Sequence, residues 1–130
     1  MTKPLAEIAI QMPLFSKARP RVTSRGTFMP KEYKQKQKEM RRQIQEQYSG
    51  EPFSGPLKLE IELRGEGRGD IDNMIGAFFD TANKILWTDD RVSIIPEVCV
   101  SWSRAKKNES SWLIKIYESN DKDIYRLPLS

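Results

Sequence analysis

A strict alternation of apolar and charged side chains runs through Leu57-Lys58-Leu59-Glu60-Ile61-Glu62-Leu63-Arg64. Successive side chains of a β-strand point to opposite faces of its sheet, so this segment predicts a strand with one buried and one wet face. The whole sequence has 130 residues, a length that supports one hydrophobic core and is too short for two. We therefore expect a single domain, residues 1–130, built around this strand.

Further strands are predicted on both sides of that segment. Residues 8–12 alternate apolar with small or polar side chains, which is typical of a strand. Residues 92–102 and 111–117 predict two more strands joined by a polar turn. Because proline cannot donate a ladder hydrogen bond, Pro96 places the earlier of these two at a sheet edge or beside a bulge.

Two helices are predicted between the strands. Residues 30–48 carry a thin apolar stripe on a mostly polar surface, and a proline is acceptable in the first helical turn. From residue 71 to residue 85 the apolar side chains recur at helical spacing, which predicts a helix packed on the core. The order βαβαββ therefore predicts an α+β fold, with helices packed against a mixed four-stranded sheet. Residues 118–130 are expected to form a C-terminal tail.

The composition excludes several kinds of catalysis. The sequence has no histidine and a single cysteine, Cys99, so Ser-His-Asp and Cys-His catalysis, zinc clusters and CxxC redox chemistry are all ruled out. Carboxylates and lysines remain for any catalysis. No apolar run is long enough to span a bilayer or to act as a signal region, so we expect a cytoplasmic protein with no membrane partner.

Positive charge is concentrated in residues 17–42, which hold ten basic and two acidic residues, although the whole chain has a net charge of only +4. Such a segment suits nucleic acid, because neutralising phosphates releases condensed counterions. A lysine-rich helix is also a common solvated face, and this alternative stays open. The residues that we expect to contact DNA are Lys17, Arg19, Arg21, Arg25, Lys31 and Lys34, together with Arg68 in the later glycine-rich loop.

The large aromatic side chains fall into two groups. Phe15 and Phe28 flank the basic loop and are expected to contact DNA. The others lie mostly within apolar periodicity and are expected in the core: Trp87, Trp102, Trp112, Phe78 and Phe79.

Four aspartates stand at the two ends of the second predicted helix. Asp70 and Asp72 occupy its start, where an acidic residue caps the helix or favours its dipole. Capping alone explains neither Asp89 and Asp90 beyond the other end nor the basic surroundings. Asn73 is either an ordinary residue of the first turn or a group that orients a carboxylate or contacts phosphate.

If three of these carboxylates converge, either one pKa rises or a cation enters the cluster. Oxygen-only ligands suit Mg²⁺ or Mn²⁺, which would activate water and neutralise charge on a phosphodiester being cut. A straight helix would place Asp70 and Asp90 at opposite ends. They meet only if the segment after the helix folds back or if a second subunit supplies one of them.

The run Arg68-Gly69-Asp70-Ile71-Asp72-Asn73, followed by Phe79-Asp80 and by Trp87-Thr88-Asp89-Asp90, resembles the RusA-type Holliday junction resolvases. The similarity extends over about residues 5–117 and includes Lys17-Ala18-Arg19-Pro20-Arg21. It implies a homodimer, nucleoid-associated, that binds four-way DNA junctions and makes paired, symmetric nicks with a divalent metal and without a small-molecule cofactor. The resemblance assigns Asp70, Asp72 and Asp90 as the catalytic, metal-binding aspartates and Asp89 as their less critical neighbour. A dimer contact around Phe78 and Phe79 is expected.

One position departs from the pattern of that family. The family commonly has a lysine four residues after the second aspartate, and this chain has Gly76 there. We expect another cation, Arg68 or Lys17, to take its place. The departure also keeps one alternative open, a catalytically weak or inactive protein that binds junctions or single strands. A nuclease directed at RNA is a further alternative.

Overall fold

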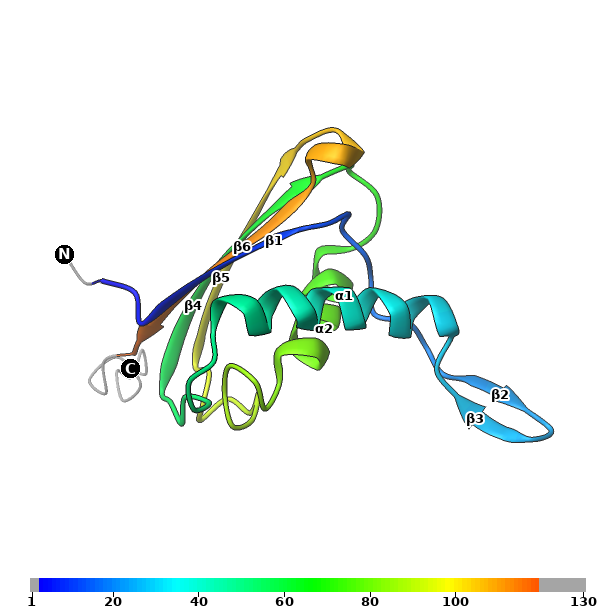
Figure 1. Ribbon diagram of the computed structural model, residues 1–130, viewed down its shortest axis with the longest axis horizontal. Helices are drawn as coiled ribbons and strands as arrows, with labels where there is room; N and C mark the ends of the chain where they lie inside the picture. The colour runs from blue at the N-terminus through cyan, green and yellow to red at the C-terminus, as the bar shows by residue number, and fades with distance from the viewer. Residues whose placement is uncertain (1–2, 120–130) are drawn as a thin grey trace, which may run out of the picture.

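The computed structural model describes residues 3–119, in which four strands form one mixed sheet (Figure 1). The strands lie in the order β1-β6-β4-β5; β4 and β5 are parallel, and the other neighbours are antiparallel. This confirms the predicted α+β fold and its four-stranded sheet. The strands are β1 (Ala6–Gln11), β4 (Leu57–Gly65), β5 (Glu97–Arg104) and β6 (Ser111–Glu118).

Both helices, α1 (Lys31–Gln47) and α2 (Ile71–Ala82), pack against one face of the sheet (Figure 1). The alternation in β4 explains why: its four leucine and isoleucine side chains are buried under the helices, and its charged side chains lie on the other face. The stripe of α1 contributes Met40 and Ile44 to this core. Helix α2 connects the parallel strands β4 and β5, so its amino end lies after the carboxyl end of β4.

Two predicted boundaries were wrong. Helix α2 ends at Ala82 and not at residue 85, because Lys84 adopts a left-handed backbone conformation with φ of 72°. The third long strand begins at Glu97 and not at residue 92, because residues 91–95 form a turn before Pro96. The placement of this strand at an edge is confirmed, since β5 is the last strand of the sheet.

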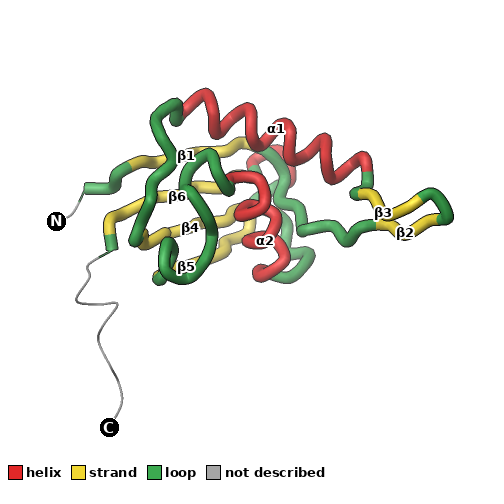
Figure 2. The backbone as a smooth tube through the Cα atoms, turned by 90° about the horizontal axis from the view of Figure 1, so that it is seen from below, coloured by secondary structure: helices red, strands yellow, loops and turns green. Residues whose placement is uncertain are grey.

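The basic loop contains a hairpin that the sequence patterns did not predict. Among the described residues, strands β2 (Arg21–Thr23) and β3 (Gly26–Phe28) pair only with each other and form a separate two-stranded sheet. The turn uses Gly26, whose φ of 119° is a conformation that favours glycine. Figure 2 shows this ribbon projecting beyond the amino end of α1, away from the main sheet.

A short 3-10 helix, η1 (Lys107–Glu109), lies in the predicted polar turn before β6. In residues 3–119, neither long helix is both long and apolar enough to cross a membrane. Most of the predicted tail, residues 120–130, lies outside the described residues.

Candidate functional site

The aspartates at the amino end of α2 keep their side chains exposed. Asp70 stands at the N-cap position, yet among the described residues its carboxylate makes no capping hydrogen bond. Asp72 accepts a hydrogen bond from the backbone N–H of Asn73 at 3.0 Å through one oxygen. Helix capping therefore does not account for Asp70. Two exposed carboxylates, two residues apart in the chain, follow the glycine-rich loop.

The loop enters this turn through Gly69, whose φ is +86°. A Cβ at residue 69 would lie 3.1 Å from Met74 Cε and 3.1 Å from Ser16 Oγ. Close approach and backbone conformation both favour glycine here, and together they fix where the chain turns into α2.

Asp89 and Asp90 lie at the other end of α2. Their loop is hydrogen-bonded to the segment that leads into β4: Thr88 N–H donates to Phe53 O at 2.9 Å, and Leu57 N–H donates to Ile94 O at 2.8 Å. Asp70, in contrast, follows the carboxyl end of β4. Figure 1 shows the loop after α2 beside the start of β4, far along the sheet from its arrowhead.

Residues 3–119 include no group of three or more Asp, Glu, Cys or His side chains close enough together to hold a metal ion. The segment after α2 does not fold back to Asp70 within the protomer. Asp89 is engaged locally, because the Arg91 guanidinium donates to it at 2.7 Å and the Asp90 backbone N–H donates at 2.8 Å. These hydrogen bonds, with Arg91 first, lower the pKa of Asp89. The convergence of Asp70, Asp72 and Asp90 stays a prediction.

Lys17 lies against α2. Its backbone N–H donates to Asn73 O at 2.9 Å, and its ammonium lies 3.4 Å from an Asp80 carboxylate oxygen. A Cβ at residue 76 would lie 3.4 Å from Lys17 Cδ, so the aliphatic stem of Lys17 crosses the helix at Gly76. The other Asp80 oxygen accepts a hydrogen bond from Tyr33 on α1 at 3.2 Å. Nothing in the local sequence indicates this network, because its members are far apart in the chain.

Two arginines lie at the glycine-rich loop, Arg64 and Arg68, and the first of them is already paired. Arg64 forms an ion pair with Glu62 at 3.2 Å on the wet face of β4. Arg68 is exposed and borders a cavity of about 330 Å³ beside the amino end of α2. The same cavity is lined by Ile71, Trp102 and Arg104. Arg68 is therefore the better placed of the two arginines to meet a phosphate next to Asp70.

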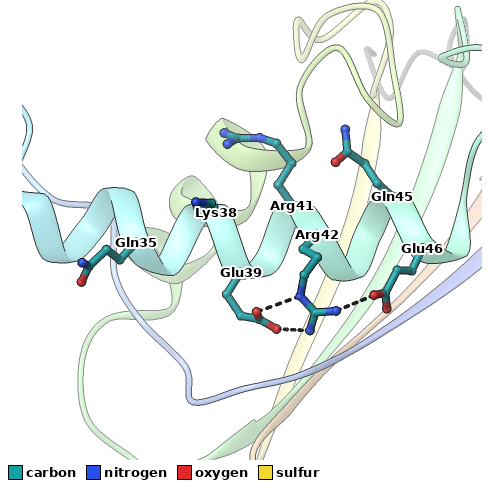
Figure 3. Close-up of a pocket in the computed structure, with 7 residues that line it drawn as sticks. All are labelled: Gln35, Lys38, Glu39, Arg41, Arg42, Gln45 and Glu46. Carbon is teal, nitrogen blue, oxygen red and sulfur yellow. Dashed lines mark hydrogen bonds and ion pairs between the residues drawn. The ribbon is translucent and has the colours of Figure 1, made fainter.

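A larger hollow than this one lies elsewhere, along the outer face of α1, with a volume of about 590 Å³ (Figure 3). There Arg42 forms ion pairs with Glu39 and Glu46, as the dashed lines in the figure mark. Hydrogen bonds from Arg42 and then from Gln43 lower the pKa of Glu39 to about 2. The charge of Arg42 is thus largely compensated on the helix itself. Arg42 therefore adds little free positive charge to this hollow, whose other cations are Lys38 and Arg41.

Two aromatic predictions were wrong. Phe15 is only 5% exposed and packs against the rings of Tyr33 and Trp112, so it belongs to the core and does not face DNA. Trp102 is 40% exposed, because it lies on the edge strand beyond the cover of the helices. The core predictions for Trp87, Trp112 and Phe78 are confirmed. Burial of Phe78 also removes it from the expected dimer contact, and Phe79 is half-buried.

An α+β domain that exposes carboxylates at a helix amino end, with a basic segment packed beside them, has the features of a protein that acts on a polyanion. The family model described as Endodeoxyribonuclease RusA matches residues 11–117. The match covers most of the chain, and the protein therefore belongs to the RusA endodeoxyribonuclease family. This confirms the predicted family. No curated protein sequence gives a significant match.

Proposed function

We propose that this protein is a divalent-metal-dependent endonuclease that resolves four-way DNA junctions by paired, symmetric nicks. Family membership supports cleavage within DNA strands. The observation that carries the proposal is the exposed pair Asp70 and Asp72, because within residues 3–119 their carboxylates make no hydrogen bond or ion pair with a distant part of the fold, and Asp72 bonds only to the N–H of its neighbour Asn73. Carboxylates that the fold does not use remain available to bind a cation.

The donor set fits a hard cation. Asp70 and Asp72 offer carboxylate oxygens only, as Mg²⁺ and Mn²⁺ prefer, and both side chains are open to solvent. Such a cation would supply an activated water and compensation for the negative charge that develops on the phosphodiester. Asn73, exposed in the same turn, would orient a carboxylate or contact the phosphate.

We infer that Asp90 of a second copy completes this site. Within one protomer, α2 rises about 18 Å over its 12 residues. Asp90 follows Trp87 by three residues, which span at most about 10 Å when extended. Trp87 is fully buried and its carbonyl accepts a hydrogen bond from Lys84 N–H at 2.7 Å, so this anchor stays at the far end of α2.

An apolar strip that no element of residues 3–119 covers supports a contact with a second copy. Val98 and Trp102 lie on the helix-facing side of edge strand β5, in register with buried Leu59 and Leu63, and remain about 40% exposed. Ile71 lies at the Asp70 end of this strip, and Val92, 82% exposed, follows Asp90 at the other. A two-fold axis across the middle of the strip would bring Asp72 of one protomer to Asp90 of the other.

The surrounding cations would hold the DNA. Neutralising phosphates next to the cut site positions the strand without reading its sequence. Lys17 has a further part in the proposal, because its stem lies beside the face of α2 that carries Asp72. It would supply the positive charge that relatives place at the position of Gly76. The residues proposed to contact phosphates are Lys17, Arg19, Arg21, Arg25, Lys31, Lys34 and Arg68.

The experiment is cleavage of a labelled synthetic four-way junction, with Mg²⁺ or with a chelator. An Asp72→Asn variant is the matched control, since it keeps the size of the side chain and removes its charge. The proposal predicts paired nicks that need both the metal and Asp72. Tight binding without cleavage under any divalent metal would favour a silent junction-binding protein. Competition by RNA as strong as by junction DNA would redirect the proposal to an RNA substrate.

A further inference from the structure

The β2–β3 ribbon has no cover within the described chain. Every residue from Arg19 to Phe28 is exposed, and the two strands pair only with each other. Figures 1 and 2 both show the ribbon projecting past the amino end of α1. A two-stranded hairpin alone is marginally stable in water, so one that carries no core is expected to be used in binding.

The chemistry of the ribbon matches a polyanion. Residues 17–31 contain five basic side chains and no acidic one. Arg25 lies in the turn at the tip, and Arg21 lies directly opposite Phe28 at the base. Val22 is 81% exposed and Phe28 is 48% exposed, which adds apolar surface beside the arginines. Such a surface suits a groove of DNA, because phosphates border the groove and thymine methyl groups offer apolar contacts inside it.

The width of the ribbon selects one groove of duplex DNA. Two paired strands lie about 4.8 Å apart before their side chains are counted. The minor groove, about 6 Å wide, is too narrow for them, whereas the major groove, about 12 Å wide, admits a two-stranded β-ribbon.

The ribbon is rooted at the candidate active site. The segment that leads into the ribbon is attached to α2 by the hydrogen bond from Lys17 N–H to Asn73 O, one residue from Asp72. Four residues from Lys17 to Arg21 span at most about 14 Å. The strand from Arg21 to the turn at Ser24 adds about 10 Å. The tip of the ribbon therefore lies at most about 24 Å along the chain from Lys17, which is less than one turn of duplex DNA, about 34 Å.

We infer that the β2–β3 ribbon is a DNA arm that enters the major groove of a duplex branch within one helical turn of the phosphate that is cut. The inference rests on the proposed nuclease function. It adds which element binds the duplex, which groove it enters and how far from the cut phosphate it does so. Arg21 and Arg25 contact the phosphates that border the groove, and Val22 faces its floor or wall.

Dimethyl sulfate footprinting on a four-way junction tests the groove. Guanine N7 faces the major groove and adenine N3 faces the minor groove, so methylation distinguishes the two. The Asp72→Asn protein, which leaves the junction uncut, should protect a patch of guanine N7 within one turn of the cut phosphate. Adding Arg21→Gln and Arg25→Gln should remove this patch and lower the slope of log affinity against log salt by about 2.

A matched control removes two positive charges from the opposite face of the sheet. Lys58→Gln with Lys115→Gln, in β4 and β6, should leave both the N7 patch and the salt slope unchanged. Protection of adenine N3 in place of guanine N7, or an N7 patch that survives loss of both arginines, would overturn the inference. So would conversion of the arginine variant to a monomer in sedimentation, since the ribbon would then be a subunit contact. If the nuclease proposal alone failed, the footprint would persist while the unmutated protein showed no metal-dependent cleavage.

Discussion

The stem of Lys17 occupies the space beside Gly76: Lys17 Cδ lies 3.4 Å from the position that a Cβ at residue 76 would take. Gly76 is one helical turn from Asp72, so the two positions share a face of α2. The stem of a lysine from another part of the chain therefore covers the place that a Cβ at residue 76 would take. Its ammonium pairs with Asp80, a further turn along the helix.

Moving the lysine from position 17 to position 76 tests whether Lys17 replaces the lysine that the family commonly has at the position of Gly76. Lys17→Ala should slow junction cleavage about 10- to 100-fold, as loss of one charge-assisted hydrogen bond at the reacting phosphate would. Lys17→Ala combined with Gly76→Lys should recover most of that loss. Single-turnover cleavage rates, measured with the DNA fully bound, separate this effect from weaker binding.

Gly76→Ala serves as the control for that exchange. The new Cβ would make an ordinary contact with Lys17, so the cleavage rate should stay the same. Thermal unfolding should show a gain of up to about 1 kcal/mol, because glycine is unfavourable inside a helix. A double variant no faster than Lys17→Ala would argue against the replacement of the family lysine by Lys17.

The hydrogen bond from Tyr33 to Asp80 predicts a pH-dependent stability. Burial, the Asp80 charge and the hydrogen bond to Asp80 all raise the pKa of Tyr33. A raised pKa stabilises the fold fully below the unfolded value of about 10, and this contribution is lost as the pH rises above it. Tyr33→Phe should cost about 1 kcal/mol at neutral pH. Urea unfolding should show that the difference from the unmutated protein shrinks above pH 10.

The comparison with Tyr33→Phe isolates one tyrosine from the others that titrate at high pH. A difference in unfolding free energy that stays constant between pH 8 and pH 11 would show that Tyr33 does not titrate differently in the folded protein.

The uncovered strip on β5 predicts a dimer contact. Trp102→Ala removes a large, partly exposed side chain from the strip and creates no cavity in the core. Because aromatic anchors often dominate an interface, the change should weaken self-association at least tenfold. Sedimentation at several protein concentrations measures it. Val22→Ala, which alters an apolar side chain on the ribbon, should leave self-association unchanged; a response to this control and not to Trp102→Ala would place the contact elsewhere.

The sheet and both helices follow from patterns that local physics dictates. The alternation in residues 57–64 predicts β4 correctly, because burying the apolar face of the strand stabilises it. Pro96 ends the preceding turn because it lacks an N–H. The hairpin escaped prediction because its strands are only three residues long and lack buried partners. Phe15 was misassigned because its burial depends on Tyr33 and Trp112, which no local pattern places next to it.

The candidate site was predictable only in part. The aspartates and their separation by a helix could be read from the sequence, since a helix has a fixed rise. The contact of Lys17 with Gly76 and Asp80 could not, because it joins a loop to a helix far along the chain. The family pattern supplied a lysine position that this chain lacks. The sequence offered Arg68 or Lys17 in its place, and the three-dimensional arrangement shows that Lys17 lies beside Gly76.

Mixing two inactive variants tests the central claim most directly. In a site built from two protomers, Asp72→Asn paired with Asp90→Asn leaves one site with both substitutions and the other site intact. The account predicts that each variant alone fails to cut a four-way junction with Mg²⁺, and that the mixture recovers metal-dependent nicking of one strand per junction. A mixture as inactive as its two components, under conditions where the unmutated protein makes paired nicks, would contradict a site shared between subunits.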